Sequence, residues 1–135
     1  IDTGIMRDWE DFEGVDIQDG INVCALLDNN EERLHIMGDA HPHGTGIIGN
    51  IAAKINNEKG IAGIVDECTV IPYKVEDTAC SDFANTCAGI LKALQLAYED
   101  GCDVVNISMG SDPNLTETQI QMFNTVVDSV TSNGR

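Results

Sequence analysis

Two side chains that could exchange a proton stand out in the first third of the chain, Asp2 and His43. Residues 1–5 have the pattern of the exit of a buried parallel strand, and open α/β sheets place their chemistry at that end of a strand. His43 begins a small, apolar, glycine-containing run that predicts a helix, so the scaffold would hold its ring at an opening. In such a pair the imidazole moves a proton and the carboxylate orients the imidazole. Structural roles are the alternative, with Asp2 as a helix cap or turn residue and His43 as a cap or a satisfied core group.

The elements that must position these side chains lie in the first 75 residues. The helix that begins at His43 is predicted to run to about residue 55, where a polar loop ends it. Residues 21–27 are a candidate strand. Residues 68–75 form the next predicted strand, in which Pro72 indicates an edge or a bulge because proline has no N–H to donate.

The second half of the chain alternates helix, strand and helix. Residues 81–100 repeat apolar side chains at spacings of three and four, which predicts an amphipathic helix that ends before Gly101. Residues 103–108 are predicted to be a short buried strand, and Thr116 with Gln119 has the form of a capping box for a last helix that ends at Gly134. This order predicts right-handed βαβ units on a parallel sheet, the α/β class. Both ends of the chain look like cuts through a larger domain.

The composition limits the classes of function. The chain has 135 residues and a net charge of -16, with 23 acidic against 7 basic residues. This balance argues against binding of nucleic acid or of an anionic membrane, both of which need a basic surface. No apolar run reaches the length of a membrane span. The five cysteines contain no C-x-x-C pair and do not settle the redox compartment, and a Cys80–Cys87 disulfide stays open.

Three segments, in this order along the chain, resemble the motifs of the subtilisin-like serine proteases, the subtilase family. They are Asp2-Thr3-Gly4, His43-Gly44-Thr45 with Gly49, and residues 104–110. The segments 55–64 and 71–75 resemble the family's loop after the histidine helix and the strand that follows it. The resemblance covers almost the whole chain. It implies a subtilisin-like three-layer fold, with a mostly parallel sheet and helices on both faces, of which residues 1–135 would be a partial catalytic domain, truncated at both ends.

The resemblance also implies catalytic roles for Asp2 and His43. Asp2 would fix the tautomer and orientation of His43, and His43 would act first as general base and then as general acid toward the leaving amine. The family's serine nucleophile and its oxyanion-hole asparagine lie further along than residue 135, so the 135 residues alone are expected to be inactive. Three departures from the family pattern leave the reacting groups in place: Gly46 where many relatives have histidine, Ile48 where alanine is usual, and the segment 9–11 where His-Pro-Asp is common.

For substrates, the resemblance assigns Ser108, Met109 and Gly110 to the strand whose backbone pairs with the bound peptide. This mode of binding makes extended polypeptides the expected substrates. A merely structural strand end and turn is the alternative. A secreted or cell-envelope location is the corresponding expectation for the whole protein.

A structural calcium site is a further implication of the resemblance. Its expected ligands are the side chains of Asp11 and Asn57 and the carbonyl oxygens of Ile55, Lys59 and Ile61. Such all-oxygen ligation suits calcium. An ordinary polar loop is the alternative, because two side chains are a thin signature.

Two other classes of function remain as alternatives. The first is a non-catalytic subtilase-like module that binds peptides or a protein partner, which the residue at the family's serine position would distinguish. The second is a transition-metal protein that uses His35, His41, His43 and cysteines, but no paired cysteine motif supports four-coordinate zinc.

Overall fold

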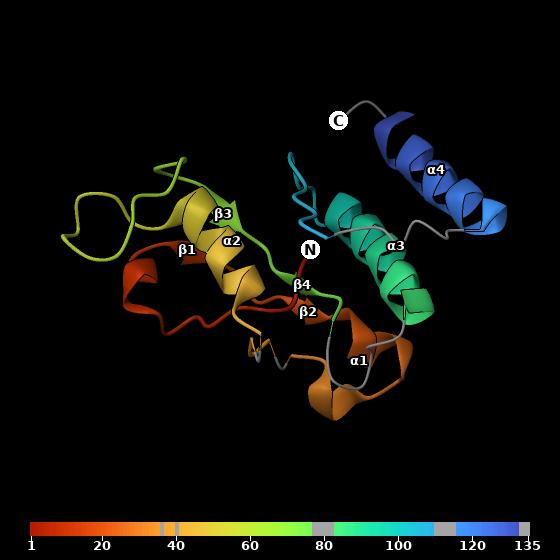
Figure 1. Ribbon diagram of the computed structural model, residues 1–135, viewed down its shortest axis with the longest axis horizontal. Helices are drawn as coiled ribbons and strands as arrows, with labels where there is room; N and C mark the ends of the chain where they lie inside the picture. The colour runs from red at the N-terminus through yellow and green to blue at the C-terminus, as the bar shows by residue number, and fades with distance from the viewer. Residues whose placement is uncertain (36, 40, 77–82, 110–115, 133–135) are drawn as a thin grey trace.

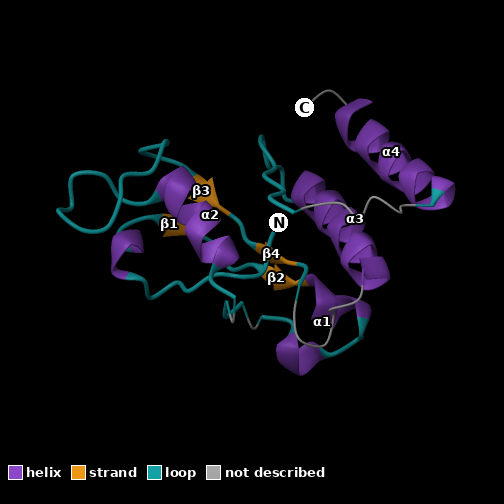
Figure 2. Ribbon diagram, in the orientation of Figure 1, coloured by secondary structure: helices purple, strands orange, loops and turns teal. Residues whose placement is uncertain are grey.

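The computed structural model describes residues 1–35, 37–39, 41–76, 83–109 and 116–132 (Figure 1). In chain order the elements are the 3-10 helix η1 (Glu10–Phe12), β1 (Asp16–Ile17), β2 (Ile21–Asn22), α1 (Val23–Leu27), the 3-10 helix η2 (Glu31–Arg33), α2 (His43–Ala52), β3 (Thr69–Val70), β4 (Tyr73–Lys74), α3 (Phe83–Glu99) and α4 (Glu117–Ser132). Figure 2 shows β2 and β4 between α2 and α3, with α4 alongside α3.

The strands of the described residues pair in parallel, as predicted. β1 pairs with β3, and β2 pairs with β4. Asp2 forms a further parallel bridge with Lys74, in which the Asp2 N–H donates to the Tyr73 carbonyl at 3.0 Å and the Val75 N–H donates to the Asp2 carbonyl at 2.9 Å. Asp2 is therefore at the end of a parallel pairing, and the α/β class is confirmed.

Two apolar clusters hold helices to the strands. One joins Tyr73 and Val75 of the β4 segment to the apolar side of α3, and it includes Val23, Ile90, Ala93, Leu94 and Ala97. The other gathers Ile5, Phe12, Met37 and Ile48 under α2. The two helices therefore pack against different strand pairs, α3 near β2 and β4 and α2 near β1 and β3.

The strand predicted over residues 21–27 is wrong beyond Asn22. Residues Val23–Leu27 form α1 instead, and the Asn22 side-chain oxygen caps this helix by accepting from the Ala25 N–H at 3.2 Å. Val23, Cys24 and Ala25 are fully buried. A short, fully buried apolar run has no exposed face, so its periodicity does not separate helix from strand.

The predicted strand 68–75 is interrupted at Ile71 and Pro72, which separate β3 from β4. Pro72 contributes its carbonyl, which accepts from the Ile21 N–H at 3.2 Å. A Cβ at Gly20 would overlap Pro72, so the two chains approach closely at this point. The irregularity predicted from Pro72 is confirmed.

Residues 103–108, predicted as a strand, form no strand within the described part of the chain. The amino group of Ile1 donates to the Asn106 carbonyl at 3.0 Å, and Val105 and Met109 pack against the α3 cluster. Val104 is 86% exposed. One backbone bond does not make a ladder, so the segment lies beside residue 1 without being a strand.

Three helices have the predicted positions with small differences at their ends. α2 ends at Ala52 rather than residue 55. α3 is described from Phe83, and the predicted residues 81 and 82 lie outside the described part. The capping box before α4 is confirmed, because the Thr116 N–H donates to Gln119 Oε1 at 2.9 Å and the Gln119 N–H donates to Thr116 Oγ1 at 3.3 Å. Residues 133–135, where this helix was predicted to end, are not described.

None of Cys24, Cys68, Cys87 and Cys102 is in a disulfide, and Cys80 lies outside the described residues. In the described ranges, no helix combines the length and the apolar character needed to cross a membrane.

Candidate active site

Asp2 and His43 come together from two different elements. Asp2 lies at the end of the parallel pairing with Lys74, and His43 is the first residue of α2. His43 Nδ1 is 2.7 Å from Asp2 Oδ1, although 41 positions separate the two residues. The Asp2 residue is 6% exposed, whereas 43% of the His43 side chain is open to solvent. One group is thus held inside the protein and the other can reach a ligand.

Hydrogen bonding defines the proton positions of this pair. Asp2 Oδ1 also accepts from the Thr3 N–H at 2.7 Å, and Asp2 Oδ2 is buried with no hydrogen-bond partner among the described residues. The hydrogen bond and the charge of Asp2 raise the pKa of His43, and the charges of Asp39 and Glu76 add to this shift against the opposing effect of burial. With Asp2 ionised, Nδ1 carries the proton of neutral His43 and Nε2 is the basic nitrogen.

Gly44 allows the two elements to approach. A Cβ at residue 44 would overlap the Gly4 carbonyl oxygen and would lie 3.1 Å from Asp2 Oδ1. By contrast, no atom lies within 4 Å of a Cβ built at Gly46, one of the departures from the family pattern. Ile48, another departure, is buried beside Phe12 in the α2 cluster. Trp9 packs on α2, since a Cβ at Gly49 would be 2.9 Å from its ring. The departures therefore alter the surroundings of the helix and not the Asp2–His43 contact.

Asp39 is a buried polar residue of this site that the sequence reasoning missed. Asp39 Oδ1 accepts from the Thr3 hydroxyl at 2.7 Å, and Asp39 Oδ2 accepts from the Thr45 N–H at 2.8 Å and from the Thr45 hydroxyl at 2.6 Å. The capping signal in a sequence is a residue directly before the helix. Asp39 lies four residues before His43, so it carries no such signal, and its segment has the pattern of an acidic loop.

The predicted substrate segment is only partly described. Ser108 Oγ accepts from the Asn106 side-chain amide at 2.9 Å, and Ser108 and Met109 are half-buried. The bond from Ile1 to the Asn106 carbonyl brings this segment beside the residue that precedes Asp2. Gly110 lies outside the described residues.

Asp11 lies at the centre of the predicted calcium loop. It is fully buried, and its Oδ1 accepts from the Asn57 side-chain amide at 3.0 Å while its Oδ2 accepts from the Ile61 N–H at 2.8 Å. Both hydrogen bonds lower the pKa of Asp11, and the bond from the Ile61 N–H has a larger effect than the bond from Asn57. A Cβ at Gly60 would overlap the Asp11 carboxylate, so the loop wraps closely around this group.

Other groups of the remaining predicted ligand residues also make contacts in this loop. The Lys59 N–H donates to Asn57 Oδ1 at 3.1 Å, and the Lys59 ammonium pairs with Glu13 at 2.8 Å. Ile55 is half-buried between α2 and this loop. The donor set is made of oxygen atoms and fits calcium, but the amide of Asn57 would have to turn over for its oxygen to face an ion beside Asp11. For the zinc alternative, no group of three or more His, Cys, Asp or Glu side chains in the described ranges is arranged to hold a metal.

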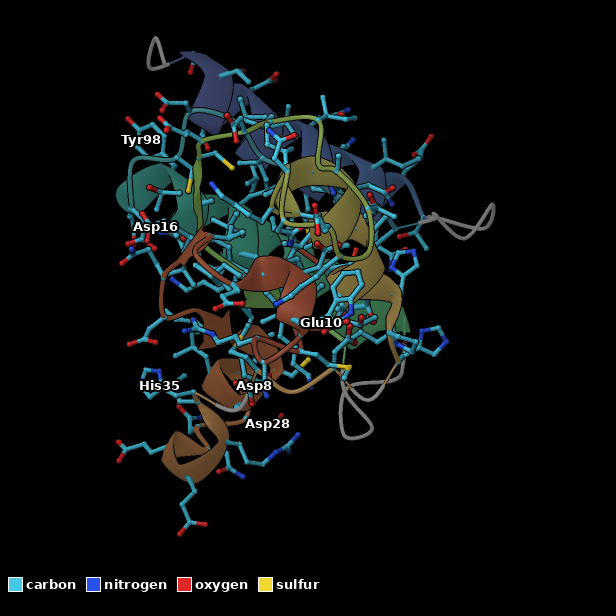
Figure 3. The ribbon with its side chains drawn as sticks, turned by 90° about the vertical axis from the view of Figure 1, so that its left-hand side faces the viewer. Asp8, Glu10, Asp16, Asp28, His35 and Tyr98 are labelled. Atoms are coloured by element: carbon cyan, nitrogen blue, oxygen red, sulfur yellow. The ribbon has the colours of Figure 1, made fainter. Side chains whose placement is uncertain are left out.

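A cavity of about 770 Å³ opens next to this site, and it does not include Asp2 or His43. Ile5 and Met37 form its buried floor. Figure 3 shows Asp8, Glu10 and His35 on the same side of the molecule, where they line this cavity.

Comparison with known proteins identifies the family of the chain. Residues 1–134 match the model described as the Subtilase family. The chain is 31% identical to a thermophilic serine proteinase of Bacillus sp. (strain AK1) over 116 residues. This aligned region covers 86% of this chain and 26% of that protein. It is 31% identical over 146 residues to the minor extracellular protease Vpr of Bacillus subtilis (strain 168), covering 99% of this chain and 17% of that protein. With tripeptidyl-peptidase 2 of Arabidopsis thaliana it shares 28% identity over 113 residues, 82% of this chain and 8% of that protein. The chain thus spans about a quarter or less of the length of these relatives.

Proposed function

Since this chain belongs to the subtilase family, we propose that the protein containing it is a serine endopeptidase in which Asp2 and His43 are two members of an Asp–His–Ser triad. The contact of 2.7 Å between His43 Nδ1 and Asp2 Oδ1 is the observation that carries this proposal. The exposed ring of a histidine held by a buried carboxylate suits a general base that must meet a substrate.

In the proposed reaction, His43 Nε2 takes the proton of the serine hydroxyl as the serine oxygen bonds to the peptide carbonyl carbon. His43 then gives this proton to the leaving amine as the peptide C–N bond breaks, which leaves an acyl-enzyme that water hydrolyses by the same steps. Asp2 stabilises the imidazolium that forms between these steps. The serine and the oxyanion-hole asparagine would come from the part of the protein beyond residue 135, so the 135 residues alone would not hydrolyse peptides.

Extended polypeptides are the proposed substrates. The support is the likeness of residues 104–110 to the family's substrate strand, together with the exposure of Val104 and Ile107 and the absence of a strand ladder there within the described residues. A segment with free backbone groups can accept a peptide as an added strand. We also propose that the protein is exported from the cell, because one of its relatives is named a minor extracellular protease.

Calcium binding at the Asp11 loop is a second proposal. Asp11, Asn57 and Ile61 gather at one place, and the carboxyl group of Asp11 is held ionised by their N–H groups. An ion there would be held by the side chains of Asp11 and Asn57 and by backbone carbonyls of the loop, and it would fix the loop that follows α2.

The proposed activity is tested on the complete protein with a serine-directed phosphonylating reagent and a peptide substrate. The reagent should abolish hydrolysis, and His43→Ala should lower turnover by roughly 10⁶, as the loss of one triad member does. Asp19→Asn is the matched control, because this carboxylate is 96% exposed and contacts Arg7 rather than the site. Near-normal turnover in His43→Ala would overturn the assignment, and an inert complete protein that still binds peptides would favour the non-catalytic alternative.

A further inference from the structure

The helix that carries His43 begins without a cap of its own. Pro42 occupies the cap position and has no side-chain acceptor. The first N–H groups of a helix have no partner within the helix and must be satisfied from outside. The His43 N–H donates to the His41 carbonyl at 2.6 Å and the Gly46 N–H to the Pro42 carbonyl at 3.0 Å. The two N–H groups between them need acceptors from elsewhere.

Those acceptors come from Asp39 and Thr3. The Gly44 N–H donates to Thr3 Oγ1 at 2.9 Å, and the Thr45 N–H donates to Asp39 Oδ2 at 2.8 Å. Asp39 is a carboxylate 9% exposed at the positive end of the α2 dipole, where a negative charge is stabilised. Asp39, four residues before His43, therefore takes the place of the cap that Pro42 does not provide.

The same carboxylate also holds the strand end that carries Asp2. Thr3 directly follows Asp2, and its hydroxyl lies 2.7 Å from Asp39 Oδ1 and 3.0 Å from the His41 carbonyl. A hydroxyl has one proton, and the ionised acceptor binds it more strongly. Asp39 Oδ1 thus accepts from Thr3, the neighbour of Asp2, and Asp39 Oδ2 accepts from Thr45, in the helix that His43 begins.

We propose that Asp39 is a positioning residue for His43, which acts through Thr3 and Thr45 to hold the imidazole against Asp2. This inference deepens the proposed function and rests on it. Asp39 has no hydrogen bond with His43 and does not touch substrate in the proposed reaction, although its charge adds to the raised pKa of His43. Its role is to fix the relative position of two backbones, and a small displacement of a reacting group lowers the rate steeply.

The complete protein tests this role with variants at both ends of the network. Asp39→Ala removes all three acceptor contacts, whereas Asp39→Asn keeps one acceptor oxygen and a similar shape and so is more certain to fold. Thr45→Val removes the hydroxyl donor, and Thr45→Ser retains it. Asp19→Asn is again the control, because it removes an exposed carboxylate outside the network.

Two readouts separate positioning from simple stability. The first is kcat and KM, measured well below the unfolding temperature of each variant. The second is the low-field NMR signal of the His43 Nδ1 proton, which reports its hydrogen bond to Asp2. Asp39→Ala should lower kcat ~100-fold with KM nearly unchanged, and Asp39→Asn and Thr45→Val should lower it less. In all three variants the His43 signal should weaken, and Thr45→Ser should restore both readouts.

A lower unfolding temperature with unchanged kcat and an unchanged His43 signal would overturn the proposal, because Asp39 would then be a structural cap only. If the unaltered complete protein did not hydrolyse peptides, the proposed function would fail. The His43 signal in Asp39→Asn would still decide whether Asp39 positions the ring.

Discussion

At the scale of single residues, the proton state of His43 decides whether the Asp2–His43 pair can act. The hydrogen bond and charge of Asp2 raise the pKa of His43 above its ordinary value of 6.5, and Asp39 and Glu76 raise it further. A general base must be neutral before it accepts a proton. The activity of the complete protein should therefore increase with pH through the raised pKa of His43 and be low at pH values below it.

Replacement of Asp2 by asparagine tests this dependence. Asp2→Asn removes the largest cause of the raised pKa of His43, so that pKa should fall and the acid limb of the kcat/KM profile should move to lower pH. Turnover should also fall by roughly 10⁴, because the amide does not hold the required tautomer. Glu76→Gln, which removes only a charge acting on His43 through space, should shift the profile in the same direction by less. An unchanged His43 titration in Asp2→Asn, followed by NMR, would contradict the assignment of the pair.

At the scale of elements, the active geometry depends on how closely α2 approaches the chain around Asp2. This approach has no room for a Cβ at residue 44, where the Gly4 carbonyl and the Asp2 carboxylate lie. The geometry of the site therefore depends on the close approach of two backbone segments as well as on the two side chains.

A pair of glycine substitutions on the same helix tests the junction. Gly44→Ala should lower the free energy of unfolding by about 1–3 kcal/mol, because the added methyl meets backbone that must move. It should also lower kcat, since the same movement separates His43 from Asp2. Gly46→Ala adds the same methyl where nothing lies within 4 Å. It should be neutral or stabilising by up to about 1 kcal/mol, from its better helix propensity. Chemical denaturation and kinetics of the two variants give the comparison, and equal effects would show that the close approach is unimportant.

The Asp11 loop provides the second test at this scale. If calcium binds there, the complete protein should melt at a higher temperature in calcium than in chelator, because a ligand that binds the folded state stabilises it. Asn57→Ala should remove that difference. Without calcium, the lowered pKa of Asp11 still implies acid sensitivity: its contribution to stability is present above the ordinary pKa of 3.8 and is lost as the pH falls through the lower folded-state value. A calcium response that persists in Asn57→Ala would place the ion elsewhere.

At the scale of the whole molecule, much apolar surface of the described residues is open. Val104 and Ile64 are the most exposed large apolar side chains, and Met122 on α4 is also exposed. The strands pair only two residues at a time. The rest of a longer protein would cover such surfaces, as expected for a chain that matches about a quarter or less of its relatives' length.

Residues 1–135 expressed alone are therefore predicted to be inactive on a mixed peptide library. They contain the Asp2–His43 pair but no serine paired with His43 among the described residues. The open apolar surface should also make the isolated chain partly unfolded or self-associating despite its charge of -16, which light scattering and thermal unfolding would show. Cleavage that survives purification and disappears in His43→Ala would contradict this prediction.

The sequence alone predicted the elements whose signals are local. The helices after His43, within residues 81–100 and after Thr116 follow from apolar spacing and caps, and Pro72 predicted the break between β3 and β4. The motifs around Asp2 and His43, together with the segments 55–64, 71–75 and 104–110, predicted the family, which the match over residues 1–134 confirms.

Only the tertiary structure decided how those elements meet. Helix α1 forms where a strand was predicted, and residues 103–108 lie beside residue 1 without forming a strand. Both outcomes depend on which residues pack against or pair with these segments. The 2.7 Å contact between Asp2 and His43, and the bonds of Asp39 to Thr3 and Thr45, join residues up to 41 positions apart. A carboxylate in an acidic loop looks the same in the sequence whether it faces water or caps a helix, because its partners are chosen by the fold and not by its neighbours along the chain.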